Sequence, residues 1–370
     1  MDMAQASDSP GQLTPGTQVG HWRLLDPLGH RAGGSLYRVE DVRHPASSLI
    51  LKLSVREGEG QLADRVARLH AAHPNVARLH GYGRWEHERG GFFYSVRDEV
   101  PGHSLVRWVE ATNPTFFQVA ALMSRLACAI DDLHARDTWH RDFHPENIQV
   151  RQGDGEPVLL DLRTGGAESL DSLLEQPLPG DLQVFRSPEA LRFLRANLGR
   201  PQARYHYLPT DDLYALGAAA YWLVTGHAPF SPGLPSEQLQ AEIELRSPPP
   251  PWEVNERVPK PIGAIIGRLM NKQPEARPYS GESLAAELMV ATSAGARSLW
   301  SRRVFDWAPE QASPEAPSQR IRVPAAPRVS SQPGPRLPRI VHFSPRSAQS
   351  VLSEVAARHT ERLLGELSPG

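Results

Sequence analysis

Cysteine is almost absent from this sequence, and its scarcity excludes two ways of holding a fold together. Cys128 is the single cysteine in 370 residues. One thiol cannot form a disulfide within the chain, and it cannot supply the ligands of a Cys-based zinc site. Folding must therefore depend on a hydrophobic core, and the 40% of residues that are hydrophobic are enough to build one.

The chain also lacks an excess of either charge and a long apolar run. Lys plus Arg number 40 and Asp plus Glu 42, which gives a formal net charge of −2. A general nucleic-acid binder would present a strongly basic face, so we expect no nucleic-acid partner. The longest apolar run, roughly 213–224, is shorter than the ~20 residues that span a bilayer. The first residues show no signal-peptide pattern, and we expect a cytoplasmic protein without a membrane span.

Proline is abundant, with 35 residues, and its placement helps to divide the chain. Residues 1–20 are rich in Ser, Pro, Gly and Gln, and we expect them to be disordered. Residues 294–346 have the composition of an extended Pro/Arg-rich linker, and an amphipathic helix is expected over 347–367. This tail either binds a partner protein or serves as a solvated linker.

The region from 21 to 293 changes character along its length. Short apolar runs typical of strands come first, at 22–28, 36–42, 49–53 and 92–96, with one helical window around 62–69. Helical periodicity then dominates, at 119–133, 212–225, 236–246, 261–271 and 281–291, with short β-like runs at 148–150 and 158–160. The pattern predicts an α+β chain that is rich in strands first and in helices later.

Four chemical signals follow one another in this region. A Gly-rich turn, LGHRAGGSL, occupies 28–36, and LILK at 49–52 ends on a lysine. The stretch HRDFHPEN fills 140–147, and DLR fills 161–163. Each alone is weak evidence, but the ordered set resembles the eukaryotic-like Ser/Thr protein kinases of bacteria, as a degenerate member.

Later residues extend the resemblance to about 21–293. Ser187-Pro188-Glu189 is similar to the family's Ala-Pro-Glu motif, and Arg277 is similar to the arginine that pairs with its glutamate. The resemblance implies a bilobal α+β fold. A small antiparallel β-sheet lobe would span 21–98 and a larger, mainly helical lobe 99–293, with ATP between them.

The resemblance also implies the cofactors ATP and Mg²⁺ and a set of site residues. Asp142 would accept or orient the proton of the substrate hydroxyl, and Asn147 and Asp161 would hold Mg²⁺ through hard oxygen atoms. The residues that it assigns to ATP binding are Leu28, Gly29, Gly34, Leu36, Lys52, Asp98 and Val100.

The expected adenine pocket departs from the family pattern. Arg31 stands at the middle glycine of the loop, and Ile50 stands where a small residue normally packs over adenine. Arg97 takes the position before the hinge, and Gln149 takes the floor position that is usually leucine. These residues predict a bulkier and more polar pocket.

Several supporting residues also differ. His144 replaces the catalytic-loop lysine, and Asp181-Leu182 replaces the Gly-Thr pair that helps to seat a Ser/Thr substrate. Arg163 replaces the flexible glycine after Asp161. The acid that pairs with Lys52 is open: the candidates are Asp64, Glu57 and Glu59, with Asp64 fitting best.

Two functions therefore compete at this stage. The first is a Ser/Thr protein kinase that transfers the γ-phosphoryl group of ATP to a protein substrate in signalling. The second is a pseudokinase, a regulatory protein-binding module with weak or no nucleotide binding. If the chain is active, Arg141 is expected to contact a phosphate on Ser169 or Ser172 of the activation segment.

Overall fold

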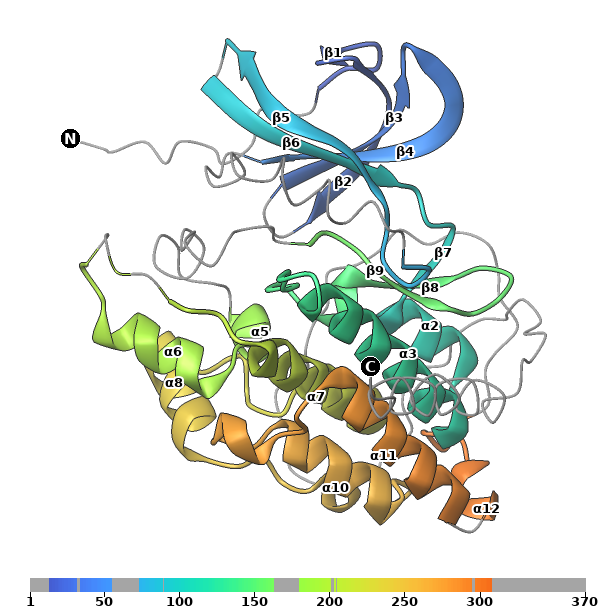
Figure 1. The fold of residues 1–370 in the computed structure, drawn as a ribbon, viewed down its shortest axis with the longest axis vertical. Coiled ribbons are helices and arrows are strands. Elements are labelled where there is room, and N and C mark those ends of the chain that lie inside the picture. Colours follow the sequence, from blue (N-terminus) through green and yellow to red (C-terminus); the bar gives the residue numbers. More distant parts are fainter. Residues whose placement is uncertain are drawn as a thin grey trace, which may run out of the picture. The chain divides into compact units, whose positions relative to one another are not determined.

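A computed structural model gives the fold of most of the region between the two tails. The residues that it describes are 13–31, 34–54, 73–88, 90–162, 180–200, 203, 205–294 and 297–307. They form two compact units, one ending at Pro101 and the other beginning at Gly102 (Figure 1). This division lies three residues beyond the boundary expected at 98/99.

The first unit is built on one antiparallel sheet, with the strand order β1-β2-β3-β4-β6-β5. Its strands are β1 (Gln18–Val19), β2 (Trp22–Arg31), β3 (Gly34–Asp41), β4 (His44–Ser54), β5 (Leu79–His87) and β6 (Gly90–Asp98). Four of them extend the runs expected from the sequence. Strand β5 was not expected, because its glycines and polar residues hide the apolar alternation.

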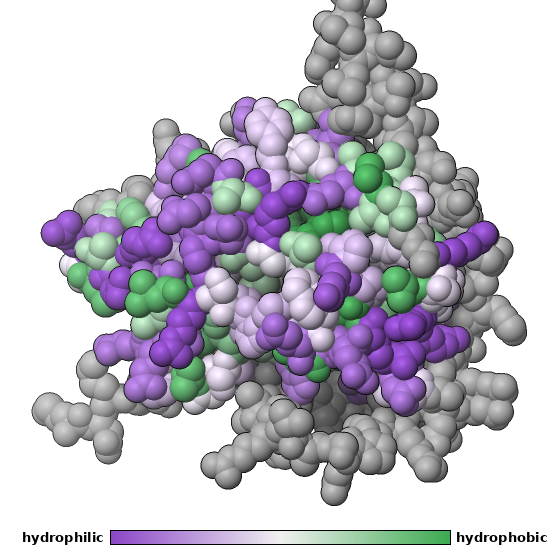
Figure 2. Space-filling view, turned by 90° about the horizontal axis from the view of Figure 1, so that it is seen from below, coloured by the Kyte–Doolittle hydropathy of each residue, from purple (hydrophilic) through white to green (hydrophobic). Residues whose placement is uncertain are grey.

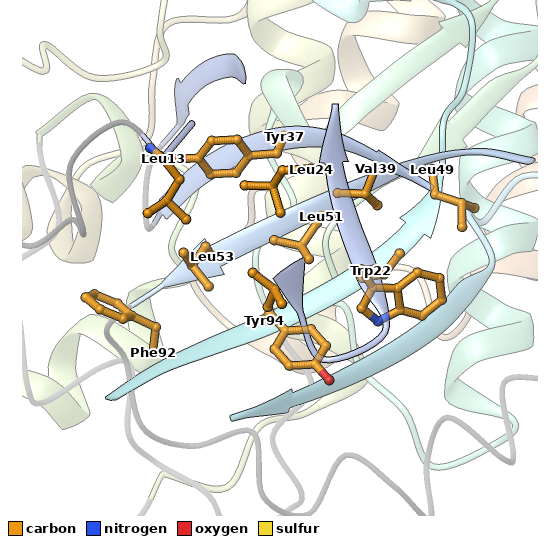
Figure 3. Packing of buried hydrophobic residues seen from close by; sticks show 12 residues of the cluster. Leu13, Trp22, Leu24, Tyr37, Val39, Leu49, Leu51, Leu53, Phe92 and Tyr94 are labelled. Carbon is orange, nitrogen blue, oxygen red and sulfur yellow. Dashed lines mark hydrogen bonds between the residues drawn. The ribbon is translucent and has the colours of Figure 1, made fainter. Parts of the chain in front are cut away.

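Alternating residues of these strands form the core of the first unit (Figure 3). Leu49, Leu51 and Leu53 are alternate residues of β4, so their side chains share one face of the sheet, and each is at most 2% exposed. Trp22 from β2 and Val96 from β6 pack into the same cluster. Burying one such side chain contributes about 1.5–3 kcal/mol, so this face of the sheet fixes the register of its strands.

Ordered structure begins earlier than the boundary expected at residue 20. Leu13 and Val19 belong to the core of the first unit, and the Leu13 N–H donates to the Tyr37 hydroxyl at 3.2 Å. These two side chains are among the few large apolar groups near this end of the chain, and the sheet offers them a place to be buried. Residues 1–12 lie outside the described part of the chain.

The second unit is mainly helical, as the sequence predicted. Its long helices are α2 (Leu105–Thr112), α3 (Phe116–His134), α6 (Pro188–Ala196), α7 (Pro209–Thr225), α8 (Ser236–Leu245), α10 (Lys260–Leu269) and α11 (Gly281–Ala294). Its shorter elements are α5 (Gly180–Gln183), α9 (Pro251–Val254), α12 (Arg297–Trp300), η1 (Pro145–Asn147) and η2 (Pro274–Ala276). A small sheet, β7 (Gly102–Ser104), β8 (Ile148–Arg151) and β9 (Pro157–Leu159), completes the unit.

Local signals explain where the two central helices begin and how they pack. Helix α3 begins with a capping box, in which Thr115 and Gln118 each satisfy the other's backbone N–H. Helix α7 is buried on nearly all sides and ends at Gly226, whose φ is 74°. A Cβ on Gly217 would lie 2.6 Å from the Leu269 Cβ, so this glycine lets α10 pack closely against α7.

The predicted helices of this region are confirmed within a few residues at each end. Helices α2 and α6 were not expected, because each spans only 8 or 9 residues, too few for a helical repeat to stand out. The helical windows expected at 62–69 and 347–367 lie outside the described residues, as does the linker beyond residue 307.

Folded structure continues past the boundary expected at residue 293. The Val304 N–H donates to the Pro114 carbonyl at 2.8 Å, and Thr115 forms an isolated β-bridge with Arg303. The Asn113 side chain donates to the Phe305 carbonyl at 2.9 Å and accepts the Phe305 N–H at 2.9 Å. The connection between α2 and α3 therefore holds this segment on the second unit.

The molecular face in Figure 2 is mostly hydrophilic, and its hydrophobic side chains lie in small patches separated by hydrophilic ones. Such scattered apolar groups are normal on folded proteins. Of the helices in the described part of the chain, none has the length and apolar character needed to cross a bilayer. The cytoplasmic location expected from the sequence stays a prediction.

Candidate active site

The loop 140–147 connects α3 to β8, and a buried carboxylate from α7 fixes its backbone. Asp212 accepts the His140 N–H at 2.8 Å and the Arg141 N–H at 2.9 Å. The His134 Nε2 lies 3.0 Å from Oδ2 of the same side chain, which is fully buried. Burial alone would raise the pKa of Asp212, but these donors outweigh it and hold the pKa below its usual range.

His140 supports the loop from inside. Burial lowers the pKa of His140, which keeps the imidazole neutral. A neutral ring can accept a hydrogen bond, and Nδ1 accepts the Asp142 N–H at 3.3 Å. The His140 ring also packs edge-on with the Phe143 ring, with the ring centroids 5.6 Å apart. The histidine therefore has a structural role in placing Asp142.

Asp142, the predicted proton acceptor, is 4% exposed and lies beside Asn147. The Asn147 Nδ2 donates to the Asp142 carbonyl at 3.0 Å and to its Oδ2 at 3.2 Å. The His144 Nε2 lies 3.8 Å from the same Oδ2. The structure thus brings together three of the residues that the sequence analysis singled out.

Arg186 completes this group, and the sequence analysis missed it. Its Nη2 donates to the Asp142 Oδ1 at 3.3 Å, and its Nη1 donates to the Arg141 carbonyl. Arg186 is 5% exposed and lies directly before the Ser187-Pro188-Glu189 motif. Its position directly before the motif could have marked Arg186 as a candidate site residue. The sequence alone does not show that it contacts a loop more than 40 residues earlier.

The two predicted metal ligands are joined through the backbone. The Leu160 N–H donates to the Asn147 carbonyl at 2.8 Å, so Asp161 follows one residue after this bond. Asp161 has a φ of 48°, in the left-handed region that few non-glycine residues adopt. The amide nitrogen of Asn147 is directed at Asp142, which leaves its Oδ1 as the side-chain oxygen that can face a cation.

Amide and carboxylate oxygens are the donors that Mg²⁺ prefers, so Asn147 and Asp161 fit this ion chemically. The described ranges contain no cluster of at least three His, Cys, Asp or Glu side chains that could hold a metal ion by themselves. Mg²⁺ in phosphoryl-transfer sites takes only one or two protein side chains and completes its shell with phosphate and water.

In the first unit, strand pairing aligns several predicted ATP-binding residues. Gly29 lies opposite Leu36 in the β2–β3 pair, and Leu36 lies opposite Lys52 in the β3–β4 pair. Gly29 has a φ of 109°, which favours glycine. A Cβ on Gly34 would lie 2.3 Å from the Leu53 carbonyl oxygen, so the sheet itself requires this glycine.

The remaining predicted ATP-binding residues lie within β2 (Leu28), at the last position of β6 (Asp98) and just beyond that strand (Val100). Leu28 is 43% exposed, which is unusual for a large apolar side chain. The Asp98 Oδ1 lies 2.5 Å from the His80 Nε2, and its carbonyl accepts from the Arg97 side chain at 3.0 Å. Val100 follows two residues later and is half-buried.

Lys52 belongs to the first unit, whereas Asp142, Asn147 and Asp161 belong to the second. Their convergence at one cleft stays a prediction. Asp64, Glu57 and Glu59, the candidate partners of Lys52, lie outside the described residues. So do Arg163, Ser169 and Ser172 of the activation segment.

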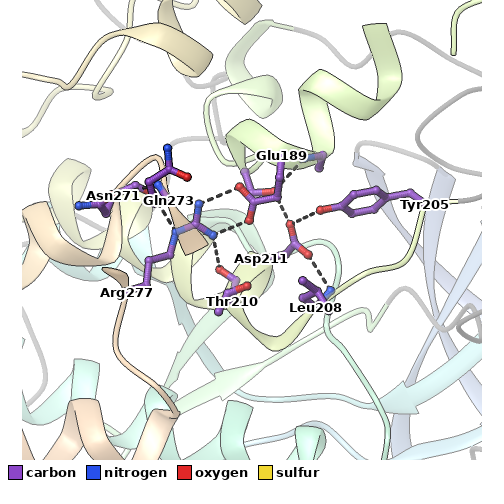
Figure 4. Close-up of polar contacts among 10 residues, drawn as sticks. Glu189, Tyr205, Leu208, Thr210, Asp211, Asn271, Gln273 and Arg277 are labelled. Atoms are coloured by element: carbon purple, nitrogen blue, oxygen red, sulfur yellow. Dashed lines mark hydrogen bonds and ion pairs between the residues drawn. The ribbon is translucent and has the colours of Figure 1, made fainter. Parts of the chain in front are cut away.

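The pairing predicted between Glu189 and Arg277 is confirmed (Figure 4). Arg277 donates through Nη1 to Oε1 at 2.6 Å and through Nη2 to Oε2 at 2.8 Å, across 88 residues of sequence. The same guanidinium donates to the carbonyls of Thr210 and Asn271, each at 2.9 Å. These bonds tie the start of α6 to α7 and to the chain after α10.

A second buried carboxylate, Asp211, lies beside this pair (Figure 4). It accepts from the Tyr205 hydroxyl at 2.9 Å, from the Leu208 N–H at 2.7 Å and from the Ser187 hydroxyl. Burial and the nearby charge of Glu189 raise the pKa of Asp211 to about 7. Ser187 also caps α6, so this network orients the motif that follows Arg186.

Comparison with known proteins decides the family. Residues 57–289, more than half of the chain, match the model of the protein kinase domain. The chain belongs to the protein kinase family. The kinase match begins after Lys52, so the Gly-rich turn and this lysine stand outside the matched residues. Protein kinase domains in general use ATP with Mg²⁺ and act on protein substrates.

Two bacterial proteins are similar to this kinase domain. The chain is 27% identical over 287 residues to the serine/threonine-protein kinase PkaA of Streptomyces coelicolor, covering 72% of this chain and 49% of the relative. It is 30% identical over 288 residues to the serine/threonine-protein kinase Pkn1 of Myxococcus xanthus, covering 75% of this chain and 39% of the relative. The chain therefore spans less than half the length of these two relatives.

A solved structure confirms the kinase fold. The autoinhibited serine kinase domain of the giant muscle protein titin matches with a TM-score of 0.53 and 14% sequence identity. The match covers 72% of this chain and 79% of that one. The small antiparallel sheet unit and the larger helical unit predicted from the sequence are thus those of the protein kinase fold.

Proposed function

We propose that this chain is a serine/threonine protein kinase, which transfers the γ-phosphoryl group of ATP to a hydroxyl group of a protein substrate in signalling. One observation carries the proposal. Asp142 and Asn147 are held together by two hydrogen bonds, and a backbone bond ties Asn147 to the strand that leads to Asp161. The bacterial relatives, which are named serine/threonine-protein kinases, support it.

The proposed reaction forms one bond and breaks one. The substrate hydroxyl oxygen bonds to the γ-phosphorus, and the bond from that phosphorus to the oxygen bridging to the β-phosphate breaks. The bridging oxygen keeps the electron pair and leaves on ADP. The hydroxyl proton passes to a carboxylate oxygen of Asp142, which Asn147 and the His140 ring hold in place.

The other predicted residues bind the nucleotide in this proposal. Mg²⁺, when bound, neutralises charge on the phosphates, and the oxygens of Asn147 and Asp161 hold it. Lys52 contacts the α- and β-phosphates. The nucleotide-lining residues are Leu28, Gly29, Gly34, Leu36, Asp98 and Val100. The Pro/Arg-rich tail remains a predicted contact for a partner protein.

A pseudokinase is the second candidate function. Ile50, Arg97 and Gln149 stand where the family resemblance leads to smaller or apolar groups, and Ile50 is 5% exposed within the sheet. His144 stands where a lysine is expected. With these substitutions the chain would keep the kinase fold and regulate a partner protein, with weak or no nucleotide binding.

Calorimetric titration with ATP, with and without Mg²⁺, separates the two functions. The proposal predicts binding that strengthens when Mg²⁺ is present, and Asp161→Asn should remove that magnesium-dependent part. Asp154→Asn is the matched control, because this carboxylate is half exposed and pairs with Arg151 on the β8–β9 turn. A wild-type chain that binds no ATP under either condition favours the pseudokinase.

A further inference from the structure

Two groups that the family resemblance leads us to expect beside the catalytic aspartate are missing from this chain. The lysine two residues after Asp142 is His144, and the threonine of the Gly-Thr pair is Leu182. A lysine is charged at neutral pH, whereas a histidine is charged only when protonated. Leucine offers no hydrogen bond. A buried carboxylate needs hydrogen-bond or charge partners to be held in place.

Arg186 supplies a permanent positive charge at this place. Its guanidinium contacts the Asp142 Oδ1 at 3.3 Å and also donates to the carbonyl of Arg141, so it holds the side chain and the backbone of the loop together. The Arg186 side chain is 6% exposed, and that of Asp142 is 4% exposed. An ion pair excluded from water is stronger than a surface pair, and losing one partner is costly.

Hydrogen bonds on both sides of Arg186 fix the position of its backbone. Its backbone N–H donates to the Gln183 carbonyl at 2.9 Å, which closes a tight turn after α5. The next residue, Ser187, caps α6 and donates to Asp211. Two residues further on, Glu189 is anchored by Arg277. The turn carrying Arg186 is thus bound to the second unit at both ends.

Arg141, the other guanidinium nearby, is placed differently. It lies over the Tyr207 ring, 5.4 Å from the centroid, and over the Trp139 ring at 5.8 Å. The Arg186 guanidinium, which follows the turn after α5, contacts the Asp142 carboxylate at 3.3 Å.

We propose that Arg186 is a positioning residue for phosphoryl transfer, which orients the Asp142 carboxylate in a chain that lacks the lysine and threonine expected near it. The inference rests on the proposed function. It extends that function by naming Arg186, in the segment before α6, as the source of the positive charge beside the catalytic aspartate.

Three variants test the assignment through phosphoryl transfer from MgATP. Arg186→Gln removes the charge and keeps hydrogen-bonding capacity, and it should lower kcat about 100-fold, as misplacement of a catalytic group does. The KM for MgATP should stay within about threefold, because Arg186 acts on Asp142 and not on nucleotide binding. Arg186→Lys keeps the charge and should retain most of kcat.

The decisive variant moves the cation back into the loop. His144 Nε2 already lies 3.8 Å from Asp142, so a lysine at position 144 reaches the same carboxylate. Arg186→Gln combined with His144→Lys should recover at least about tenfold of the lost kcat. Arg192→Gln is the matched control: this arginine lies on α6, is 53% exposed and contacts Glu244.

Unfolding by denaturant provides a readout that needs no activity. Arg186→Gln is made both in the wild type and in an Asp142→Asn variant. It should lower the unfolding midpoint clearly more in the wild type, because the partner of Arg186 is already altered in the variant and the effects of paired residues are not additive. Additive losses overturn the inference. So does an unchanged or raised kcat in Arg186→Gln, and a raised kcat would show that Arg186 blocks Asp142. A wild type without any transfer overturns the proposed function instead, and the unfolding comparison then judges the pairing by itself.

Discussion

Asp212 at the start of α7 holds the backbone of Arg141, whose N–H it accepts at 2.9 Å across 71 residues of sequence. Asp212→Asn replaces one accepting oxygen with a donor, which then faces the donors of the loop or of His134. We expect a lower unfolding temperature and a kcat at least about tenfold lower, since the loop carrying Asp142 is no longer fixed. Thermal unfolding and steady-state kinetics check both effects. Wild-type kinetics in the variant would show that α7 does not control the loop.

The Glu189–Arg277 pair predicts a large loss of stability. Arg277→Met leaves Glu189 without its partner, and we expect the free energy of unfolding to fall by about 3–5 kcal/mol. Denaturant unfolding measures it. The half-exposed pair of Glu242 and Arg246 is the control, and Arg246→Met there should cost less than about 1 kcal/mol. Equal losses at the two pairs would contradict the role of the buried one.

Asp211 predicts a pH dependence of stability. Its pKa is raised from 3.8 to about 7 in the folded chain. Between those values the folded state retains a proton that the unfolded state has released, so this group makes stability fall as pH rises from about 4 to about 7. Asp211→Asn cannot titrate and should remove that part of the slope. Unfolding measured at several pH values tests it, and parallel curves for the two proteins would refute the shift.

The residues at the positions where the family resemblance leads us to expect the adenine pocket predict weak nucleotide binding. Ile50→Ala with Gln149→Leu restores a small residue and an apolar floor, and we expect this double variant to bind ATP more tightly than the wild type. Titration of both proteins with ATP gives the comparison. Tight and equal binding would show that the wild-type residues are accommodated, and the pseudokinase would lose support.

Much of the fold was visible in the sequence because it depends on local periodicity. The apolar repeats of α3 and α7 predicted both helices, and Glu189 and Arg277 were paired from motifs alone. Strand β5 was missed, since its polar and glycine residues become a strand only through pairing with β6. The place of Leu13 in the core was also missed, because one apolar residue in a polar segment gives no periodic signal.

The candidate site was predictable only in part, for a similar reason. The motif 140–147 places Asp142 and Asn147 five residues apart on one loop, so their contact follows from chain proximity. The contact between Arg186 and Asp142 depends on how α5 and α6 pack in the second unit. Such packing leaves no periodic pattern in a single sequence, so it could not be predicted. The raised pKa of Asp211 could not be predicted for the same reason. It depends on how deeply this side chain is buried, and the sequence does not state that.

A phosphorylation assay shows directly whether Asp142 serves phosphoryl transfer. Purified wild-type chain and Asp142→Asn are each incubated with magnesium and ATP labelled at the γ-phosphate, together with a general protein substrate. We expect label on protein serine or threonine with the wild type and essentially none with Asp142→Asn, while both bind ATP alike. Equal labelling by the two proteins would show that Asp142 is not the proton acceptor, and no labelling by a wild type that binds MgATP would show that the chain does not transfer the phosphoryl group.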